Sequence, residues 1–178
     1  MAANLDRPES AILLPVDVPV AVRRLRDGLD PVAGVGVPAH VTLLFPFAPP
    51  GRLDEGTRTA LGRIIASEPV FPFVLREVGR WPRQVYLLPE PSDPFKRLIA
   101  RLAVAYPEYP PYAGAHKVAD IVPHLTVADS ERTDYLDAAA HALPFLLPVR
   151  AVGREAWVMA HDAGERWRTV WKLPLGAE

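Results

Sequence analysis

The chain has 178 residues, and its 20 Lys and Arg against 21 Asp and Glu leave a formal net charge of −1. Apolar residues make up 49% and charged residues 23%, an ordinary balance for a globular protein that argues against intrinsic disorder. The chain has no cysteine, which excludes a disulfide framework, a Cys-ligated zinc site and thiol chemistry.

Hydrophobic periodicity and turn residues predict a chain of mixed strands and helices. In chain order, we expect a strand at 11–18, a helix with Val22, Leu25 and Leu29 inward, a strand at 39–47, a helix with Leu61, Ile64 and Ile65 inward, strands at 70–78 and 84–88, a helix with Phe95, Leu98, Ile99 and Leu102 inward, a loop at 106–117, a strand at 121–128, a helix at 133–143, and strands at 156–160 and 167–173. Asp17, Asp54 and Ser92 are candidate helix caps, and residues 79–83 and 162–164 are candidate turns. This order predicts an α+β fold with largely antiparallel sheets, as a single domain over residues 1–178 with two similar halves.

Several aromatic residues are expected in the core. Phe45 follows Val41 and Leu43 at strand spacing, so we place it on their side of the strand. The C-terminal tryptophans are expected to pack together across adjacent strands; these are Trp157, Trp167 and Trp171.

Two short segments carry the same polar pattern within predicted strands. Residues 40–42 read His-Val-Thr, and residues 124–126 read His-Leu-Thr. Because side chains alternate across a strand, His40 and Thr42 share one face, as do His124 and Thr126, while their apolar neighbours face the core. One such motif alone is more often a structural histidine. The matched pair instead predicts the wall of a cleft.

Two facing histidines have a specific chemical use. Near neutral pH a neutral imidazole accepts a proton while a protonated one donates a proton, and cleavage of a phosphodiester needs both actions. The threonine hydroxyls can donate hydrogen bonds to non-bridging phosphate oxygens. We therefore predict His40 and His124 as catalytic residues and Thr42 and Thr126 as phosphate-binding residues, with no cofactor and no metal.

The paired motifs resemble those of the two-histidine (2H) phosphoesterase superfamily, in the branch named after the 2′-5′ RNA ligases and cyclic phosphodiesterases. The two histidines lie 84 residues apart (124 − 40), and Pro123 precedes the second one, as is common in that branch. The resemblance implies two pseudo-symmetric lobes flanking a central cleft, and metal-independent hydrolysis of a 2′,3′-cyclic phosphate or a 2′-5′ linkage. It implies that His40 protonates the leaving ribose oxygen and that His124 activates water.

The same resemblance implies the partners: an RNA terminus or a small nucleotide with a cyclic phosphate or 2′-5′ linkage. None of the three lysines lies in a Lys-x-Asp-Gly motif, so any 2′-5′ ligation is expected to be the ATP-independent reversal of cleavage. The near-zero charge disfavours a grip on long duplex DNA, because such binding draws on a large basic excess. We expect no membrane association and a cytoplasmic location, since the sequence shows neither a long apolar run nor a signal peptide.

Further substrate contacts are expected near one predicted turn. Trp81 could stack on a nucleobase or pack on the body of the protein. Arg80, Arg83 and Lys117 could reach a phosphate or remain solvated surface charges. Tyr86 faces either the cleft or the core, and strand parity does not decide between them.

The remaining histidines, His116, His141 and His161, lack the motif. His141 is expected on a helix surface, and His161 at the start of a turn. With His124 or Asp129 they could form a metal site, but no two of them have a recognised ligand spacing. Two other function classes stay open: a non-catalytic RNA- or nucleotide-binding module with the same cleft, and a metal-dependent hydrolase.

Overall fold

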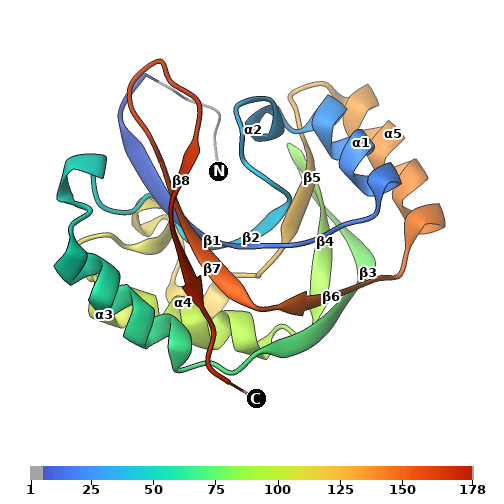
Figure 1. The fold of residues 1–178 in the computed structure, drawn as a ribbon. Coiled ribbons are helices and arrows are strands. Elements are labelled where there is room, and N and C mark those ends of the chain that lie inside the picture. Colours follow the sequence, from blue (N-terminus) through green and yellow to red (C-terminus); the bar gives the residue numbers. More distant parts are fainter. Residues whose placement is uncertain (1–5, 178) are drawn as a thin grey trace.

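The computed structural model describes residues 6–177. Its main elements, in chain order, are β1 (Glu9–Pro15), α1 (Val20–Leu29), α2 (Pro31–Gly34), β2 (His40–Leu44), α3 (Glu55–Ala66), β3 (Phe71–Trp81), β4 (Gln84–Glu90), α4 (Asp93–Ala105), β5 (Leu125–Asp129), α5 (Thr133–Ala142), β6 (Val149–Gly153), β7 (Glu155–His161) and β8 (Arg168–Pro174). Figure 1 shows this arrangement. Within residues 6–177, no helix has both the length and the apolar character needed to cross a bilayer.

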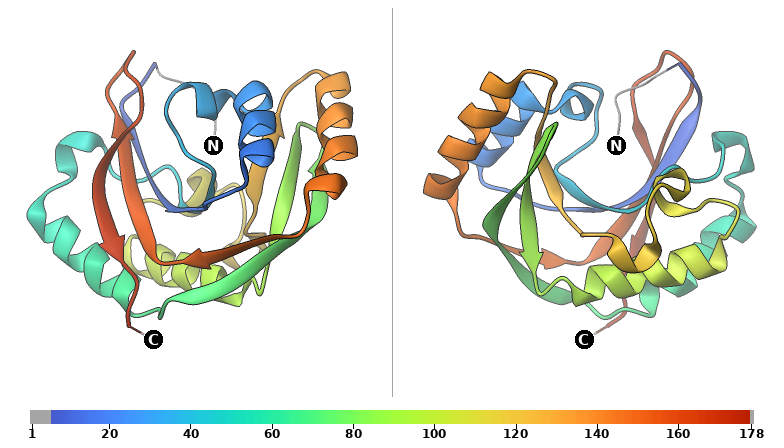
Figure 2. Two further views of the ribbon diagram at one scale, coloured as in Figure 1. Left: turned by 45° about the vertical axis from the view of Figure 1, so that its right-hand side comes forward. Right: turned by 180° about the vertical axis from the view of Figure 1, so that it is seen from behind.

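The strands form two antiparallel sheets, which confirms the expected α+β class. The first sheet has the order β2-β1-β7-β8, and the second has the order β5-β4-β3-β6. Helices α3 and α4 lie together against the first sheet, and α1 and α5 lie together against the second (Figures 1 and 2). The helix pairs thus bury one apolar face of each sheet, as a two-layer fold requires.

The two motif strands occupy matching positions in the two sheets. Each is an edge strand that pairs with the strand preceding it in the chain. Helices α1 and α2 lie between β1 and β2, and helix α4 lies between β4 and β5. The helices cross over, since α1 packs on β5 and α4 packs on β2. This exchange brings the β2 and β5 edges next to each other, and the two His-x-Thr motifs with them.

The apolar faces of both motif strands belong to one core. Val41 and Leu43 of β2 and Leu125 and Val127 of β5 are almost fully buried in the same hydrophobic cluster. Burying a side chain of this size contributes about 1.5–3 kcal/mol relative to leaving it exposed. A one-residue slip of either strand would expose these side chains, so the core fixes which face carries the histidine and threonine.

The helix starts agree with the sequence only in part. Asp54 caps α3 as predicted, since its carboxylate accepts a hydrogen bond of 2.7 Å from the Thr57 amide. The prediction that Asp17 caps α1 is wrong: the helix begins at Val20, and Asp17 is exposed and pairs with Arg23 at 3.4 Å. The reason is Pro19, because a residue that precedes proline is disfavoured in the helical region and the start moves beyond the reach of Asp17. Helix α4 begins at Asp93 after Ser92, whose side chain makes no capping hydrogen bond.

The strand ends also differ from the prediction. Strand β3 runs through Trp81, so its connection to β4 is Pro82-Arg83 alone instead of residues 79–83. Strand β5 starts at Leu125 and not at residue 121. Strand β2 ends at Leu44, so the alternation stops there, and Phe45 packs in a smaller cluster, apart from Val41 and Leu43.

The three C-terminal tryptophans do not pack as one group. In the register of β7 and β8, Trp157 lies opposite Lys172 and Trp171 lies opposite Val158, so the two indoles point to opposite faces of the sheet. Trp171 packs on the main core, and Trp167 is buried in the smaller cluster. Trp157 and the partner of Trp171 are consecutive residues of β7, and consecutive residues of a strand point to opposite faces, so the two indoles are separated.

Candidate active site

The two motif histidines are held by the same local contact. The Nδ1 atom of His40 lies 2.7 Å from the carbonyl oxygen of Pro38, and the Nδ1 atom of His124 lies 2.7 Å from the carbonyl oxygen of Val122. A carbonyl only accepts hydrogen bonds, so we assign the proton of each neutral imidazole to Nδ1. In both histidines Nε2 then carries a free lone pair, so Nε2 is the atom available for proton transfer.

The two motif threonines offer free donors beside the histidines. Thr42 lies opposite Leu13 in the first sheet, and Thr126 lies opposite Tyr86 in the second. Both side chains are half-buried, and neither hydroxyl makes a hydrogen bond to another residue between positions 6 and 177. Each hydroxyl can therefore donate to a ligand without breaking a contact in the protein.

Burial disfavours the protonated form of both histidines. It lowers the pKa of His40 to about 3, and the nearby Arg26 guanidinium also acts to lower this pKa. Burial also lowers the pKa of His124 to about 4. Positive charge on His124 disfavours protonation of His40 as well, so the two sites bind a first proton more easily than a second one. A bound phosphate anion acts in the opposite direction and favours an imidazolium.

Arg26 connects the two motifs. Its side chain is buried at the end of α1, where Nη1 donates to the Val37 carbonyl at 2.9 Å and Nε donates to the Thr126 carbonyl at 3.3 Å. Its Nη2 forms an ion pair of 2.8 Å with Asp30, whose other carboxylate oxygen accepts a hydrogen bond from the Val32 amide. One guanidinium thus joins the backbone just before His40 to the backbone of the second motif. Nothing in the sequence pattern indicates this contact.

Aromatic rings surround His124. The centroid of the Trp81 ring lies 4.7 Å from that of the His124 ring, in an edge-on arrangement, and 4.1 Å from that of the Tyr86 ring. The centroids of the Tyr86 and His124 rings are 5.3 Å apart. Tyr86 crosses over Gly79 of β3, where an added Cβ would lie 2.2 Å from the tyrosine ring. Gly79 is therefore needed for Tyr86 to reach this position. Tyr86 thus contacts His124 and Trp81, but it is buried and is not among the residues that line the cavity beside His124.

A cavity of about 500 Å³ opens beside His124. Its wall opposite Trp81 comes from the loop after α4, and its lining residues are Trp81, Gln84, Tyr112, His116, Asp120, Ile121, Val122 and His124. The Tyr112 amide donates to the Phe45 carbonyl at 2.6 Å and so ties this loop to the end of β2. Tyr112 and Ala113 have φ values of 54° and 53°, a left-handed backbone that non-glycine residues adopt only at an energetic cost. Burial raises the pKa of Tyr112 to about 12.

Sequence reasoning did not predict six of these lining residues as part of the substrate site. They are Gln84, Tyr112, His116, Asp120, Ile121 and Val122. Only the Pro-, Tyr- and Gly-rich composition of residues 106–117 marked an irregular loop, and nothing in the sequence connected it with His124.

The expected cations lie away from the cavity. Arg80 pairs with Asp137 at 2.6 Å, and Arg83 pairs with Glu131 at 3.0 Å, both at the surface. Lys117 is exposed and is not among the lining residues. The structure therefore gives these three side chains no place at the wall of this cavity.

The other histidines lie apart from the motif pair, except for His116 at the cavity wall. His141 is exposed on α5 as expected, and His161 ends β7 before a turn, fully buried with its ring 4.5 Å from Trp167. In the part of the chain that the structure describes, no three His, Asp or Glu side chains gather as a group that could hold a metal ion.

Comparison with known proteins agrees with this fold. The sequence matches the 2′-5′ RNA ligase superfamily over residues 14–165. Among solved structures, it is similar to TT0787 of Thermus thermophilus, with a TM-score of 0.60, 21% identity, and coverage of 96% of this chain and 99% of that one. It is also similar to E. coli LigT complexed with 3′-AMP, with a TM-score of 0.56, 20% identity, and coverage of 95% of this chain and 99% of that one.

LigT complexed with NADP+ gives a TM-score of 0.54 at 19% identity, over 96% of this chain and 99% of that one. At these identities the likeness shows the fold. No curated protein matches the sequence significantly. The chain therefore belongs to the 2′-5′ RNA ligase superfamily of 2H phosphoesterases, which are generally enzymes that act on phosphodiester bonds.

Proposed function

We propose that this protein is a metal-independent phosphodiesterase that hydrolyses 2′,3′-cyclic phosphate or 2′-5′ phosphodiester bonds at RNA ends or in small nucleotides. Ligation of 2′-5′ ends would be ATP-independent attack of a 5′-hydroxyl on a 2′,3′-cyclic phosphate, in which the new phosphodiester bond forms as the bond from phosphorus to the 3′-oxygen breaks. The observation that carries the proposal is the matched pair of histidines, each fixed through Nδ1 to the carbonyl two residues earlier, with Nε2 free and a free threonine hydroxyl two residues later.

The reaction on a cyclic phosphate follows from these groups. The hydroxyls of Thr42 and Thr126 donate hydrogen bonds to the non-bridging oxygens and hold the phosphate between the motifs. One histidine takes a proton from water as its oxygen attacks phosphorus. The other gives a proton to the ribose oxygen as the bond between phosphorus and that oxygen breaks. The product is a nucleoside monophosphate, and the two histidines have exchanged protonation states.

The charges at the site favour one division of roles. The Arg26 guanidinium acts with burial to lower the pKa of His40, whereas no side-chain cation among the described residues acts in this way on His124. The proton that a bound phosphate stabilises therefore goes first to His124. We assign His124 as the general acid and His40 as the general base, the reverse of the roles that the resemblance implied.

The cavity beside His124 supports a nucleotide as the substrate class. Trp81 is about one-third exposed at its wall and presents an indole surface on which a base can stack, a contact that is worth about 1–3 kcal/mol per base in single-strand binding proteins. The related LigT has been crystallised with 3′-AMP and with NADP+, both of which are nucleotides. We place the ribose phosphate between the histidines and the base toward Trp81.

The direct test is hydrolysis of the four nucleoside 2′,3′-cyclic monophosphates with excess EDTA. We expect turnover by the native protein, a loss of about 10²- to 10⁴-fold in His40→Ala and in His124→Ala, and no change in His141→Ala, an exposed histidine outside the site. If none of the four is hydrolysed, a 2′-5′-linked dinucleotide is the second substrate.

Two outcomes would replace the proposal. Saturable nucleotide binding without turnover of either substrate would identify a non-catalytic binding module. Activity that EDTA abolishes and zinc restores would identify a metal-dependent hydrolase.

A further inference from the structure

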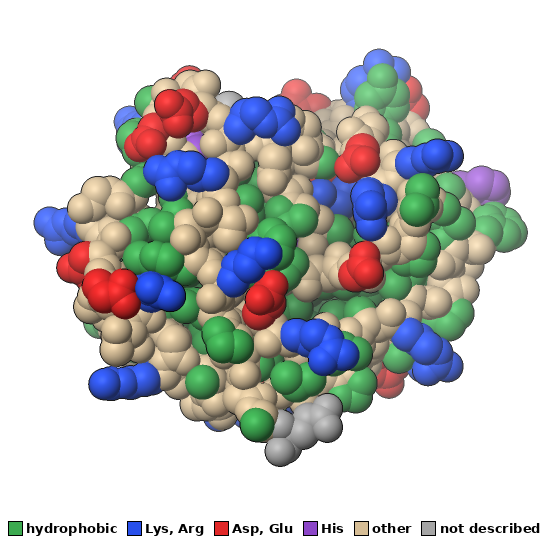
Figure 3. Space-filling view, in the orientation of Figure 1, with side chains coloured by type: hydrophobic (Ala, Val, Ile, Leu, Met, Phe, Trp, Pro, Cys, Tyr) green, Lys and Arg blue, Asp and Glu red, His purple; other side chains and the backbone are tan. Residues whose placement is uncertain are grey.

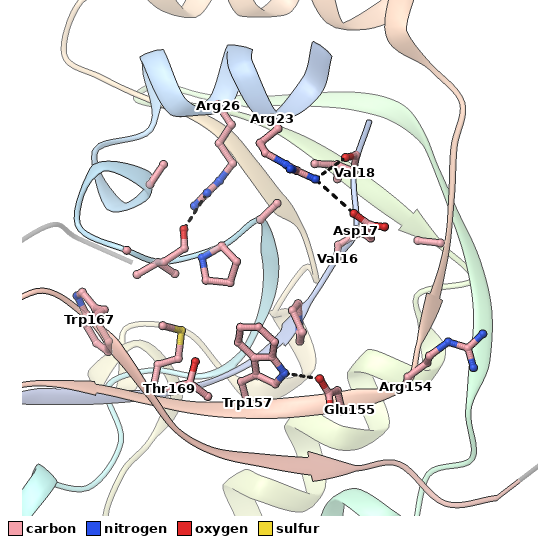
Figure 4. A pocket seen from close by; sticks show the side chains of 18 of the residues that line it. Val16, Asp17, Val18, Arg23, Arg26, Arg154, Glu155, Trp157, Trp167 and Thr169 are labelled. Atoms are coloured by element: carbon pink, nitrogen blue, oxygen red, sulfur yellow. Dashed lines mark hydrogen bonds and ion pairs between the residues drawn. The ribbon is translucent and has the colours of Figure 1, made fainter. Parts of the chain in front are cut away.

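A second and larger cavity lies next to the first motif, since Arg26, Pro38 and Ala39 line it and the Pro38 carbonyl contacts Nδ1 of His40. It has a volume of about 920 Å³ and lies between α1, residues 33–39, the end of β6 and strands β7 and β8 (Figure 4). None of the four motif residues lines it, and it has no lining residue in common with the cavity beside His124. Small-molecule sites typically measure about 300–1,000 Å³, so this cavity has room for a nucleotide.

An indole is fixed at the floor of this cavity. Trp157 rises from β7 into the space below α1 (Figure 4), and its Nε1 donates to the Glu155 carboxylate at 2.6 Å. The Lys172 ammonium lies 4.4 Å from the centre of the same ring. These two contacts hold the half-buried ring in one orientation. An oriented aromatic ring is a stacking surface for a planar ligand.

Two arginines at the same cavity have no partner in the protein. The side chains of Arg150 on β6 and Arg154, between β6 and β7, are exposed and make no hydrogen bond or ion pair with any residue from 6 to 177. In Figure 4 the Arg154 side chain lies at the rim of the cavity and points away from Trp157. The other two arginines that line the cavity are engaged, since Arg26 pairs with Asp30 and Arg23 pairs with Asp17. Cationic and acidic side chains are mixed over the face seen in Figure 3, so this pair is a local feature and not part of a basic surface. Guanidinium groups suit the oxygens of a phosphate.

An acidic side chain at this cavity favours a ligand that carries hydroxyl groups as well as a phosphate. Asp27 of α1 lines the cavity, is exposed, and has no hydrogen bond or ion pair among the described residues. A carboxylate would repel a phosphate, but it accepts hydrogen bonds from ribose hydroxyls, as in dinucleotide-binding sites. The cavity thus presents one aromatic ring, two free cations and one free acceptor.

We infer that this cavity is a second nucleotide-binding site, where the base stacks on Trp157, Arg150 and Arg154 hold the phosphate, and Asp27 accepts from the ribose. The inference does not depend on the chemistry of the histidines. The nucleotide can be free, or it can be a remote unit of an RNA strand whose end occupies the histidine cavity. Both sources share the same chemistry.

The test uses the indole N–H signals of the four tryptophans, assigned by Trp→Phe variants and followed by NMR in His124→Ala protein so that no ligand is consumed. Adenosine 5′-monophosphate should shift the Trp157 signal saturably. Arg150→Ala/Arg154→Ala should raise the half-saturating concentration at least about tenfold, the loss expected when charge-assisted contacts are removed. Arg63→Ala, which removes an exposed arginine of α3, should leave it unchanged.

Three results would overturn the inference: a Trp157 signal that does not move at millimolar nucleotide, an equal shift in the double arginine variant, or an equal shift with inorganic phosphate alone. A second titration, with a 2′-5′-linked oligonucleotide, distinguishes a free nucleotide from a nucleotide that is part of an RNA strand. An RNA strand that occupies both cavities should move the Trp81 and Trp157 signals at one common concentration. If the site binds a free nucleotide instead, the nucleotide should shift the Trp157 signal with its own half-saturating concentration. The oligonucleotide should in that case shift only the Trp81 signal.

Discussion

Arg26→Met removes a side chain that hydrogen-bonds to the backbone beside both motifs. The variant keeps most of the side-chain length but loses two hydrogen bonds, to the Val37 and Thr126 carbonyls, and the ion pair with Asp30. The Asp30 side chain is only 2% exposed, so its carboxylate is left buried without a counter-charge. Breaking a buried ion pair in this way costs about 3–5 kcal/mol, a large part of the roughly 5–15 kcal/mol that is typical of a folded domain.

The second effect is on the reaction. Without Arg26, the backbone on either side of the site loses its anchor, and a misplacement of about 1 Å can lower a rate by about 10²-fold. The pKa of His40 should rise, because a positive charge beside it is gone. The acid limb of the profile of kcat/KM against pH should therefore move to higher pH, while kcat falls.

Urea unfolding and the pH profile of cyclic phosphate hydrolysis measure these effects separately. Arg26→Lys is the matched control: it restores a charge that can pair with Asp30 but cannot reach both carbonyls as well. We expect it to recover part of the stability and little of the rate. The reasoning is refuted if Arg26→Met folds with a loss below about 1 kcal/mol, which is well under the cost of breaking a buried pair, or if it retains the native rate and pH profile.

Three further predictions concern the histidines and their surroundings. The pKa values of His40 and His124 are lowered in the folded state, so the unfolded chain binds more protons as the pH falls below its ordinary histidine pKa of about 6.5. Stability should drop from about pH 6.5 toward about pH 4, with a limiting slope of about 2.7 kcal/mol per pH unit for two protons; chemical unfolding at several pH values measures this slope, and the double His→Gln variant should flatten it. Gly79→Ala should displace the Tyr86 ring, which would lie 2.2 Å from the new Cβ, and raise KM at least several-fold; an unchanged KM would show that the ring position does not matter. A nucleoside 2′,3′-cyclic phosphate with sulfur in place of the leaving ribose oxygen needs little protonation of its leaving group, so it should rescue His124→Ala and not His40→Ala, and the opposite pattern would reverse the assigned roles.

The sequence was most informative where local geometry alone decides the outcome. Strand alternation was enough to place His40 with Thr42 and His124 with Thr126, opposite the apolar residues that the core buries. It failed at Phe45, because β2 ends one residue earlier. Helix-cap reasoning failed at Asp17, because Pro19 moves the start of the helix. Both of these errors lie at an element end, where one neighbouring residue changes the backbone.

The rest of the site depends on contacts between distant parts of the chain. The hydrogen bond from Arg26 to Thr126 joins positions 100 residues apart, and an arginine in a helix pattern gives no sign of such a partner. Tyr112 and His116 reach the cavity only because the loop after α4 is tied to the end of β2. The sequence pattern places Trp81 in a turn, but it is the last residue of β3, which is why its ring lies against His124.

The measurement that tests the central claim most directly is hydrolysis of a nucleoside 2′,3′-cyclic monophosphate by EDTA-treated protein, with His40→Ala, His124→Ala and the double variant compared under the same conditions. If the two histidines act as one acid–base pair, each single variant should lose about 10²- to 10⁴-fold, and the double variant should lose little more than a single one, because groups that act as a unit are not additive. Losses that multiply in the double variant, or a single variant with the native rate, would contradict the two-histidine mechanism.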